Sequence, residues 1–320
     1  MTMMVSRGTL KRLLNAGAFG AGAVLFVLVI RLSGRSLPDL LGRAVNARPV
    51  YLLAVVVTLF AQAAIIALRW KVLLGEAARN TGAGKGFFFY ASNMGLLMTS
   101  ILPVVGNIGT VAASAKLERD VPLSRTVYAA IQGYAAGFVV LWAMLVPSAL
   151  YLAKTLGRTA GAVGLGLVAG ALIAASGKIW RGLWRAAVSL GGRLPRFGPR
   201  LAGFPVPDER DAGRIVRLTV AAYSVIFIRH LLVLSAFDLP VPPLAFALVF
   251  PLGYAVSSLG VTPGNLGTSE LGWFGALSSV GLGREDAVLY AIGQRVLNTG
   301  AILVLAGVSA VYYQIAKRRA

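Results

Sequence analysis

Long runs of uncharged, mostly apolar residues alternate with short charged segments along the chain. No charged side chain occurs between Leu13 and Ile30, between Val50 and Leu68, between Val127 and Ala153, or between Val296 and Ala316. A helix of roughly 20 such residues crosses the ~30 Å hydrocarbon core of a bilayer. The pattern therefore predicts full helical crossings at about 13–33, 50–70, 127–152, 159–177, 214–237 and 286–314.

Two further apolar segments do not fit simple crossings. Residues 86–110 and 244–268 each end in a tract that contains Gly and Pro, which interrupts a helix. Broken helices are tolerated at membrane depth only where they are buried in protein or face a polar cavity. We therefore expect two re-entrant helical hairpins, with return limbs at about 111–122 and 269–281.

The chain also contains an internal repeat at an offset of about 160 residues. Three pairs of segments match in the same order: Ile66–Arg69 with Ile226–Arg229, Gly95–Thr110 with Gly253–Thr268, and Tyr128–Gln132 with Tyr290–Gln294. In the longest pair, six of 16 positions are identical and three are conservative. The predicted crossings place the two copies in opposite directions, which is typical of transporters that bind their substrate beside broken helices.

These patterns together predict the fold class. We expect an all-α polytopic membrane protein with about six full transmembrane helices and two re-entrant hairpins in an inverted repeat. Residues 1–320 would form a single transmembrane domain, with repeat one at about 50–152 and repeat two at about 214–316. A basic cytoplasmic loop at 178–213, which contains several prolines, would join the repeats.

Composition supports this interpretation. Hydrophobic residues make up 57% of the chain and charged residues only 13%, with a mean hydropathy of +0.77. A soluble domain averages about a quarter charged residues. The net charge of +20 does not indicate nucleic acid, because the basic residues lie in short clusters at the ends of apolar runs. Anionic phospholipid headgroups are the partners that this distribution favours.

The same clusters predict the orientation. In the predicted topology, both termini and 22 basic residues lie on one membrane face. Seven basic residues lie on the opposite face. Because basic residues accumulate on the cytoplasmic side, both termini are expected there, in a bacterial or archaeal inner membrane.

The candidate functional residues lie around the two predicted hairpins. Glu270 follows the Gly- and Pro-containing tract of the second hairpin, and Arg295 lies about ten residues into the last crossing. A charge in the apolar zone is expensive unless it is paired. Glu270 therefore fits either a structural cap or ion pair, or a gating or proton-coupled group. Arg295 needs an anion, for which Glu270 or a lipid phosphate are the candidates.

Further polar groups occupy equivalent positions in the two repeats. Arg69 and Arg229 fit either side chains that reach the membrane surface, or a pair that receives a phosphate headgroup at the two mouths of one path. Asn107 and Asn265, with Gly264 and Gly267, lie at the hairpin tips. Their amides fit either substrate binding or the satisfaction of backbone groups freed by the turn.

Several classes of function lack their signatures. The chain has no Cys and one His, His230, so neither a thiolate site nor a His cluster for metal is expected. Residues 82–86 do not form a phosphate-binding loop, because Lys85 is followed by Gly. We expect no enzymatic activity, no cofactor and no bound metal.

At Thr262–Glu270 the chain resembles the flippase-like transmembrane region of lysyl-phosphatidylglycerol synthetases, which also occurs as free-standing membrane proteins. That family has a Pro-Gly-Gly-x-Gly-x-x-Glu tract followed by an arginine in the final span, positions that Glu270 and Arg295 occupy here. Leu68–Trp70 and Ile101–Gly109 resemble its other conserved tracts. The chain departs from the family at Ser269 and at 110–113, where the family often carries charged residues, so a different lipid is possible.

The resemblance implies a lipid translocator, a flippase or scramblase-like protein for a phospholipid or a polyprenyl-phosphate-linked lipid. It does not extend to lysyl transfer, because the soluble transfer domain has no counterpart here. Two other classes remain open from the residues themselves. One is a secondary transporter of a small solute or ion, and the other is a non-transporting partner of a membrane glycosyltransferase or lipid synthase. A homo-oligomer is compatible with each.

Overall fold

A computed structural model describes residues 7–75, 85–101, 123–192, 206–259 and 262–319. These residues form eleven α-helices and one 3₁₀ turn, and the described ranges contain no strand. The helices are α1 (Arg7–Ser33), α2 (Leu37–Val45), α3 (Pro49–Leu74), α5 (Lys85–Ile101), α7 (Leu123–Leu152), α8 (Arg158–Ala174), α9 (Ser176–Gly192), α11 (Glu209–Ala236), α12 (Pro243–Ser258), α13 (Thr268–Ser278) and α14 (Arg284–Arg319), with the 3₁₀ turn η1 (Pro263–Asn265) between α12 and α13.

The long helices follow the uncharged runs of the sequence. Four of them, α3, α7, α11 and α14, are long and apolar enough to cross a membrane. Two more spans are possible if each bent pair counts as one, since α1 meets α2 at 82° and α8 meets α9 at 79°. The predicted all-α polytopic fold is confirmed, and each of the six predicted crossings coincides with one of these helices.

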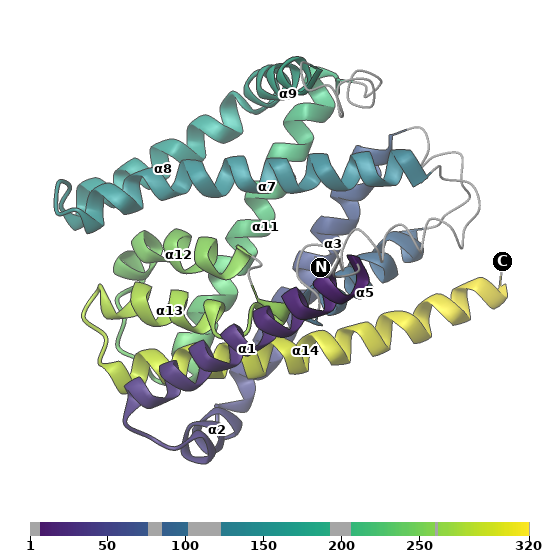
Figure 1. Cartoon of the computed structure of the whole chain (residues 1–320). Helices are drawn as coiled ribbons and strands as arrows, with labels where there is room; N and C mark the ends of the chain where they lie inside the picture. Colours follow the sequence, from purple (N-terminus) through teal and green to yellow (C-terminus); the bar gives the residue numbers. More distant parts are fainter. Residues whose placement is uncertain (1–6, 76–84, 102–122, 193–205, 260–261, 320) are drawn as a thin grey trace, which may run out of the picture.

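The helices α3 and α11 form a packed antiparallel pair near the centre of the molecule (Figure 1). Gln62 of α3 contacts Arg229 of α11, whereas Arg69, further along α3, contacts Thr219, which lies earlier in α11. The residue numbers of the contacts thus rise on one helix and fall on the other. The pair that carries the repeated Arg residues is therefore antiparallel, as an inverted repeat requires.

The second predicted hairpin is a pair of short helices joined by a break. The 16-residue α12 and the 11-residue α13 pack side by side, and η1 lies between them (Figure 1). Each is shorter than the roughly 20 residues of a full crossing. Of the first hairpin, the structure describes α5, which packs along α14 through the stacked rings of Tyr90 and Tyr313. Its predicted tip and return limb lie outside the described residues.

Two amphipathic helices lie largely outside the predicted crossings and hairpins. One is α2, which begins at the cap Ser36 and buries Leu40 and Ala44. The other is α9, in the first part of the segment expected as a basic loop, which buries Trp180 and Trp184 against the bundle. Both helices carry basic side chains on their exposed faces. These residues interrupt the apolar pattern of the sequence, so the buried faces of the two helices were not predicted.

Candidate functional site

The break between α12 and α13 is organised by Glu270, the third residue of α13. Its side chain is fully buried, with 0% exposure. The backbone N–H of Gly267, the residue that caps the helix, donates to Oε2 of Glu270 at 2.7 Å. A carboxylate at this place also interacts favourably with the unpaired amides of the first helical turn. Glu270 thereby stabilises the start of the return limb.

Arg295 of α14 ties the break together. Its Nε donates to Oε1 of Glu270, and its Nη2 donates to Oε2 at 3.2 Å. The same guanidinium donates from Nη1 to the carbonyl oxygen of Gly264 at 3.0 Å and from Nη2 to that of Asn265 at 2.9 Å. Four contacts thus satisfy one planar cation and one buried anion together. Arg295 keeps 24% of its side chain exposed, so one edge of this ion pair is open.

The backbone of the break needs residues that tolerate positive φ. Gly264 has φ of 60°, Asn265 of 55° and Gly267 of 77°, which Gly and Asn adopt more readily than other residues. Two hydroxyls complete the turn: Thr262 Oγ1 donates to the carbonyl of Leu266 at 2.7 Å, and Thr268 Oγ1 donates to that of Asn265 at 3.2 Å. The side-chain Oδ1 of Asn265 is buried and has no partner among the described residues.

The first helix, α1, packs directly against this turn. A Cβ added to Gly22 would lie 2.8 Å from the carbonyl oxygen of Leu266 and 3.0 Å from Cβ of Thr262. The absence of a side chain at Gly22 therefore lets α1 approach the backbone of the break. The turn η1 of the break packs against α1 and α5, and α14 reaches it through Arg295.

Arg229 and Arg69 lie elsewhere, in the seam between α3 and α11. Arg229 is 6% exposed and donates from Nη1 to Oε1 of Gln62. Arg69 donates from Nη1 to Oγ1 of Thr219 at 3.2 Å. The hypothesis that both side chains reach the membrane surface fails for Arg229, which turns inward and lies seven residues before the end of α11.

Neither of these two guanidinium groups has an anionic partner in the described ranges. The ion pairs there involve Arg35, Arg43, Arg48, Arg214 and Arg295. The Nε atoms of Arg69 and Arg229 are buried and make no hydrogen bond to the described residues. A cation inside a membrane helix is costly unless it is paired, so packing alone does not account for this arrangement.

His230, next to Arg229, belongs to an aromatic core. Its Nδ1 lies 2.6 Å from the hydroxyl of Tyr290, and its ring lies 4.4 Å from that of Trp273. Phe246 and Phe250 of α12 complete the cluster. These contacts make His230 a hydrogen-bonded packing residue of the core.

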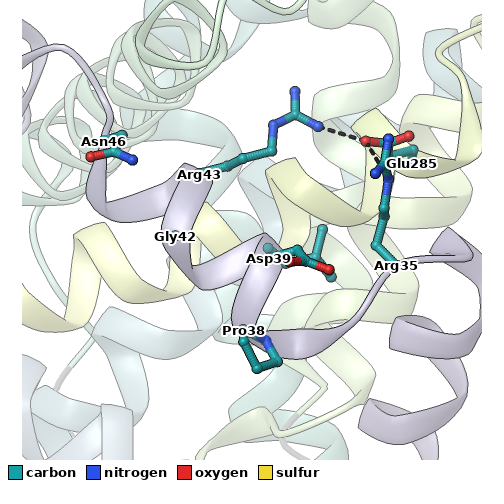
Figure 2. Close-up of a pocket in the computed structure, with 8 residues that line it drawn as sticks. Arg35, Pro38, Asp39, Gly42, Arg43, Asn46 and Glu285 are labelled. Atoms are coloured by element: carbon teal, nitrogen blue, oxygen red, sulfur yellow. Dashed lines mark hydrogen bonds and ion pairs between the residues drawn. The ribbon is translucent and has the colours of Figure 1, made fainter.

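A shallow pocket of about 690 Å³ lies at the start of α14, against α2. Figure 2 shows Arg35 and Arg43 both directed toward Glu285. All three side chains are substantially exposed, and such pairs contribute little to stability. In the part of the chain that the structure describes, no group of three acidic or His side chains could hold a metal ion.

The structure brings most of the predicted site residues into two groups. Glu270, Arg295, Gly264, Gly267 and Asn265 meet at one break, and the predicted pairing of Arg295 with Glu270 is present. Arg69 and Arg229 share the second group, while Asn107 lies outside the described residues.

Sequence reasoning missed the partners of the two arginines. Gln62 is the only amide side chain in the apolar run from Val50 to Leu68. A lone amide in such a run indicates a polar partner on a neighbouring helix, so Gln62 could have been recognised from the sequence. Thr219 carried no such signal, because hydroxyls within helices commonly bond to their own backbone, as Thr219 also does to Ile215.

The sequence profile described as the lysylphosphatidylglycerol synthase TM region matches residues 14–307. The chain belongs to this family. No curated protein sequence and no solved structure matches the chain. Membership of the lysylphosphatidylglycerol synthase TM family, together with several long apolar helices, identifies a multi-pass membrane protein.

Proposed function

We propose that this protein translocates lipids across the cytoplasmic membrane. The headgroup would pass the break between α12 and α13, and the acyl chains would stay in the surrounding bilayer. The observation that carries this proposal is the ion pair of buried Glu270 with Arg295, which lies at a helix break inside a bundle of apolar helices. The membrane region named in the family's description belongs to synthases of a phospholipid, which supports lipid as the cargo.

The physical need for such a path is clear. A charged or hydrogen-bonding headgroup cannot enter hydrocarbon without replacing its hydration, because desolvating a charge is prohibitive. Polar groups at a helix break supply that replacement. At the break these groups are the amides at the start of α13 and the hydroxyls of Thr262 and Thr268. The open edge of Arg295 adds positive charge next to them.

The inverted repeat belongs to the same proposal. The antiparallel packing of α3 on α11 supports two oppositely oriented copies. A headgroup would then meet a comparable polar surface from either leaflet, as in transporters that alternate around a midplane site. We propose that both termini are cytoplasmic and that the protein moves lipid without changing it chemically.

Reconstitution into liposomes tests the proposal. Fluorescently labelled phosphatidylglycerol and phosphatidylcholine are incorporated with the protein, and dithionite quenching from outside measures the lipid that changes leaflet. We expect quenching beyond the outer-leaflet fraction for at least one lipid. The Glu270→Gln variant should lower the rate at least about tenfold, because Arg295 loses the charge that balances it.

Glu285→Gln is the matched control, since it removes a carboxylate that pairs with arginines at the exposed end of α14. Its translocation rate should equal that of the unmodified protein. Mass spectrometry of the recovered lipids should find them unaltered. Folded protein that moves no lipid, beside an active positive control, would overturn the proposal.

A further inference from the structure

The seam between α3 and α11 holds two arginines in a reciprocal arrangement. Arg69 of α3 contacts α11 at Thr219, and Arg229 of α11 contacts α3 at Gln62. Gln62 and Arg69 are seven residues apart, which corresponds to about 10 Å along a helix. The two guanidinium groups therefore occupy successive levels of one helix interface.

Each guanidinium keeps donors that protein groups do not use. One nitrogen of each is hydrogen-bonded to a neutral oxygen across the seam, and both Nε atoms are buried without a partner in the described ranges. No carboxylate of the described residues lies within ion-pair distance of either one. The planar guanidinium fork matches the oxygens of phosphate, and a buried cation without an anion is incomplete.

Two tyrosines connect the seam to α12. Tyr223 of α11 packs edge-on against Tyr254, with ring centroids 5.4 Å apart, and donates its hydroxyl to the carbonyl of Gly137 at 3.1 Å. Because Tyr254 belongs to the outgoing limb of the broken hairpin, the seam adjoins the proposed headgroup path.

Helix α7 packs against another side of Arg69. A Cβ added to Gly133 would lie 3.7 Å from Nη2 of Arg69, and Gly137 follows one turn later beside Tyr223. Two glycines one turn apart thus let α7 pack closely on the polar part of the seam.

We propose that the α3–α11 seam is a two-position binding site for a phosphate diester, which Arg69 and Arg229 bind in turn. The inference rests on the proposed function and specifies its cargo: the headgroup is that of a phosphate-bearing lipid. A step of about 10 Å is too long for one phosphate to bridge, so the two arginines act one after the other. Each would exchange its neutral partner, Thr219 or Gln62, for phosphate oxygens.

Ligand binding to the intact protein provides the first test. Protein in dodecyl maltoside and phosphate-free buffer is unfolded thermally with dihexanoyl-phosphatidylglycerol, with dihexanoylglycerol, or with inorganic phosphate. The phosphatidylglycerol should raise the melting temperature, and the phosphate-free lipid should not, because only the former supplies the missing anion. An equal rise with inorganic phosphate would overturn the assignment to lipid, and no rise with any of them would overturn the site.

Transport through the seam provides the second test. Arg69→Gln and Arg229→Gln should each slow translocation of labelled phosphatidylglycerol at least about tenfold, because a charge-assisted hydrogen-bonded contact is lost. Arg→Lys at either position should restore part of the rate. The exposed Arg158→Gln is the matched control and should leave the rate unchanged.

The results of these experiments distinguish failure of the proposed phosphate site from failure of the proposed lipid translocation. If lipid moves at normal rates in both Gln variants, the seam is overturned while translocation stands. If a labelled glucosyl lipid without phosphate moves as fast as phosphatidylglycerol in the unmodified protein, the phosphate specificity is overturned. The second comparison needs no variant and therefore holds even where a substitution prevents folding. A protein that moves no lipid overturns the proposed function itself.

Discussion

Arg69, Arg229 and Arg295 differ in the groups that compensate their positive charge. Arg295 has a carboxylate and two backbone carbonyls, whereas Arg69 and Arg229 have one neutral oxygen each. A buried ion pair contributes little net stability, because desolvation offsets most of the attraction. Removing one member is costly, since the other stays buried and uncompensated. The Glu270–Arg295 pair therefore fixes the conformation of the break more than it stabilises the fold.

This distinction predicts a measurable coupling. Glu270→Ala should lower the free energy of unfolding by about 3–5 kcal/mol, because Arg295 is left without its anion and Gly267 without its acceptor. The double variant Glu270→Ala, Arg295→Met should lose less than the sum of the two single variants. Reversible unfolding in bicelles measures all three.

The surface carboxylate Glu285 serves as the control for the stability measurements on Glu270. Its pairs with Arg35 and Arg43 are exposed, so Glu285→Ala should change stability by less than about 1 kcal/mol. Additive losses for the buried pair would contradict the coupling and would mean that Arg295 is held by the two carbonyls alone.

At the scale of elements, α1 covers the helix break and depends on Gly22 to do so. Gly22→Ala should destabilise the protein by about 1–3 kcal/mol, because the new methyl group would press on the backbone of Leu266. Gly20→Ala on the same helix should be neutral or slightly stabilising, since nothing lies within 4 Å of its Cβ position. Thermal unfolding of the two variants compares them directly. Equal melting temperatures would show that α1 does not pack on the break.

The amphipathic helix α9 makes a second prediction at this scale. Trp184 is buried and contacts the rings of Tyr128 and Trp180, with centroids 5.6 Å and 5.8 Å away. Trp184→Ala should therefore cost about 3–5 kcal/mol through the cavity it leaves. Leu183→Ala, next to it on the exposed face, should stay within about 0.5 kcal/mol. Limited proteolysis of α9 would report the loss of docking, and equal protection of both variants would count against it.

At the scale of the whole molecule, the charge asymmetry predicts how the bundle lies in the membrane. The chain has no Cys, so single Cys substitutions report topology without background labelling. Ser189→Cys in α9 should react with an impermeant maleimide only from the cytoplasmic side, and Ala153→Cys, after α7, only from the opposite side. Spheroplasts and inverted vesicles distinguish the two. Labelling in the reverse pattern would invert the topology and place both termini outside.

Much of this architecture was predictable from the sequence. Runs without charge set the positions of the long helices, because only an α-helix satisfies its own backbone in lipid. The tract from Thr262 to Glu270 predicted a helix break, since Gly and Pro interrupt the ladder of hydrogen bonds. The charge of Arg295 demanded an anion, and Glu270 was the protein group proposed for it. The helices α2 and α9 were not predicted, because their apolar faces are narrow and lie between basic residues.

What the sequence determined by itself is thus the list of helices, the break and the need to pair Arg295. These follow from local composition, through hydropathy, backbone conformation and the cost of a lone charge. The tertiary structure alone decided which neighbours the other cations have. Arg69 and Arg229 matched each other in the repeat, but their burial against Thr219 and Gln62 depends on the register of α3 on α11. Register arises from packing between residues some 150 positions apart, and no local pattern encodes it.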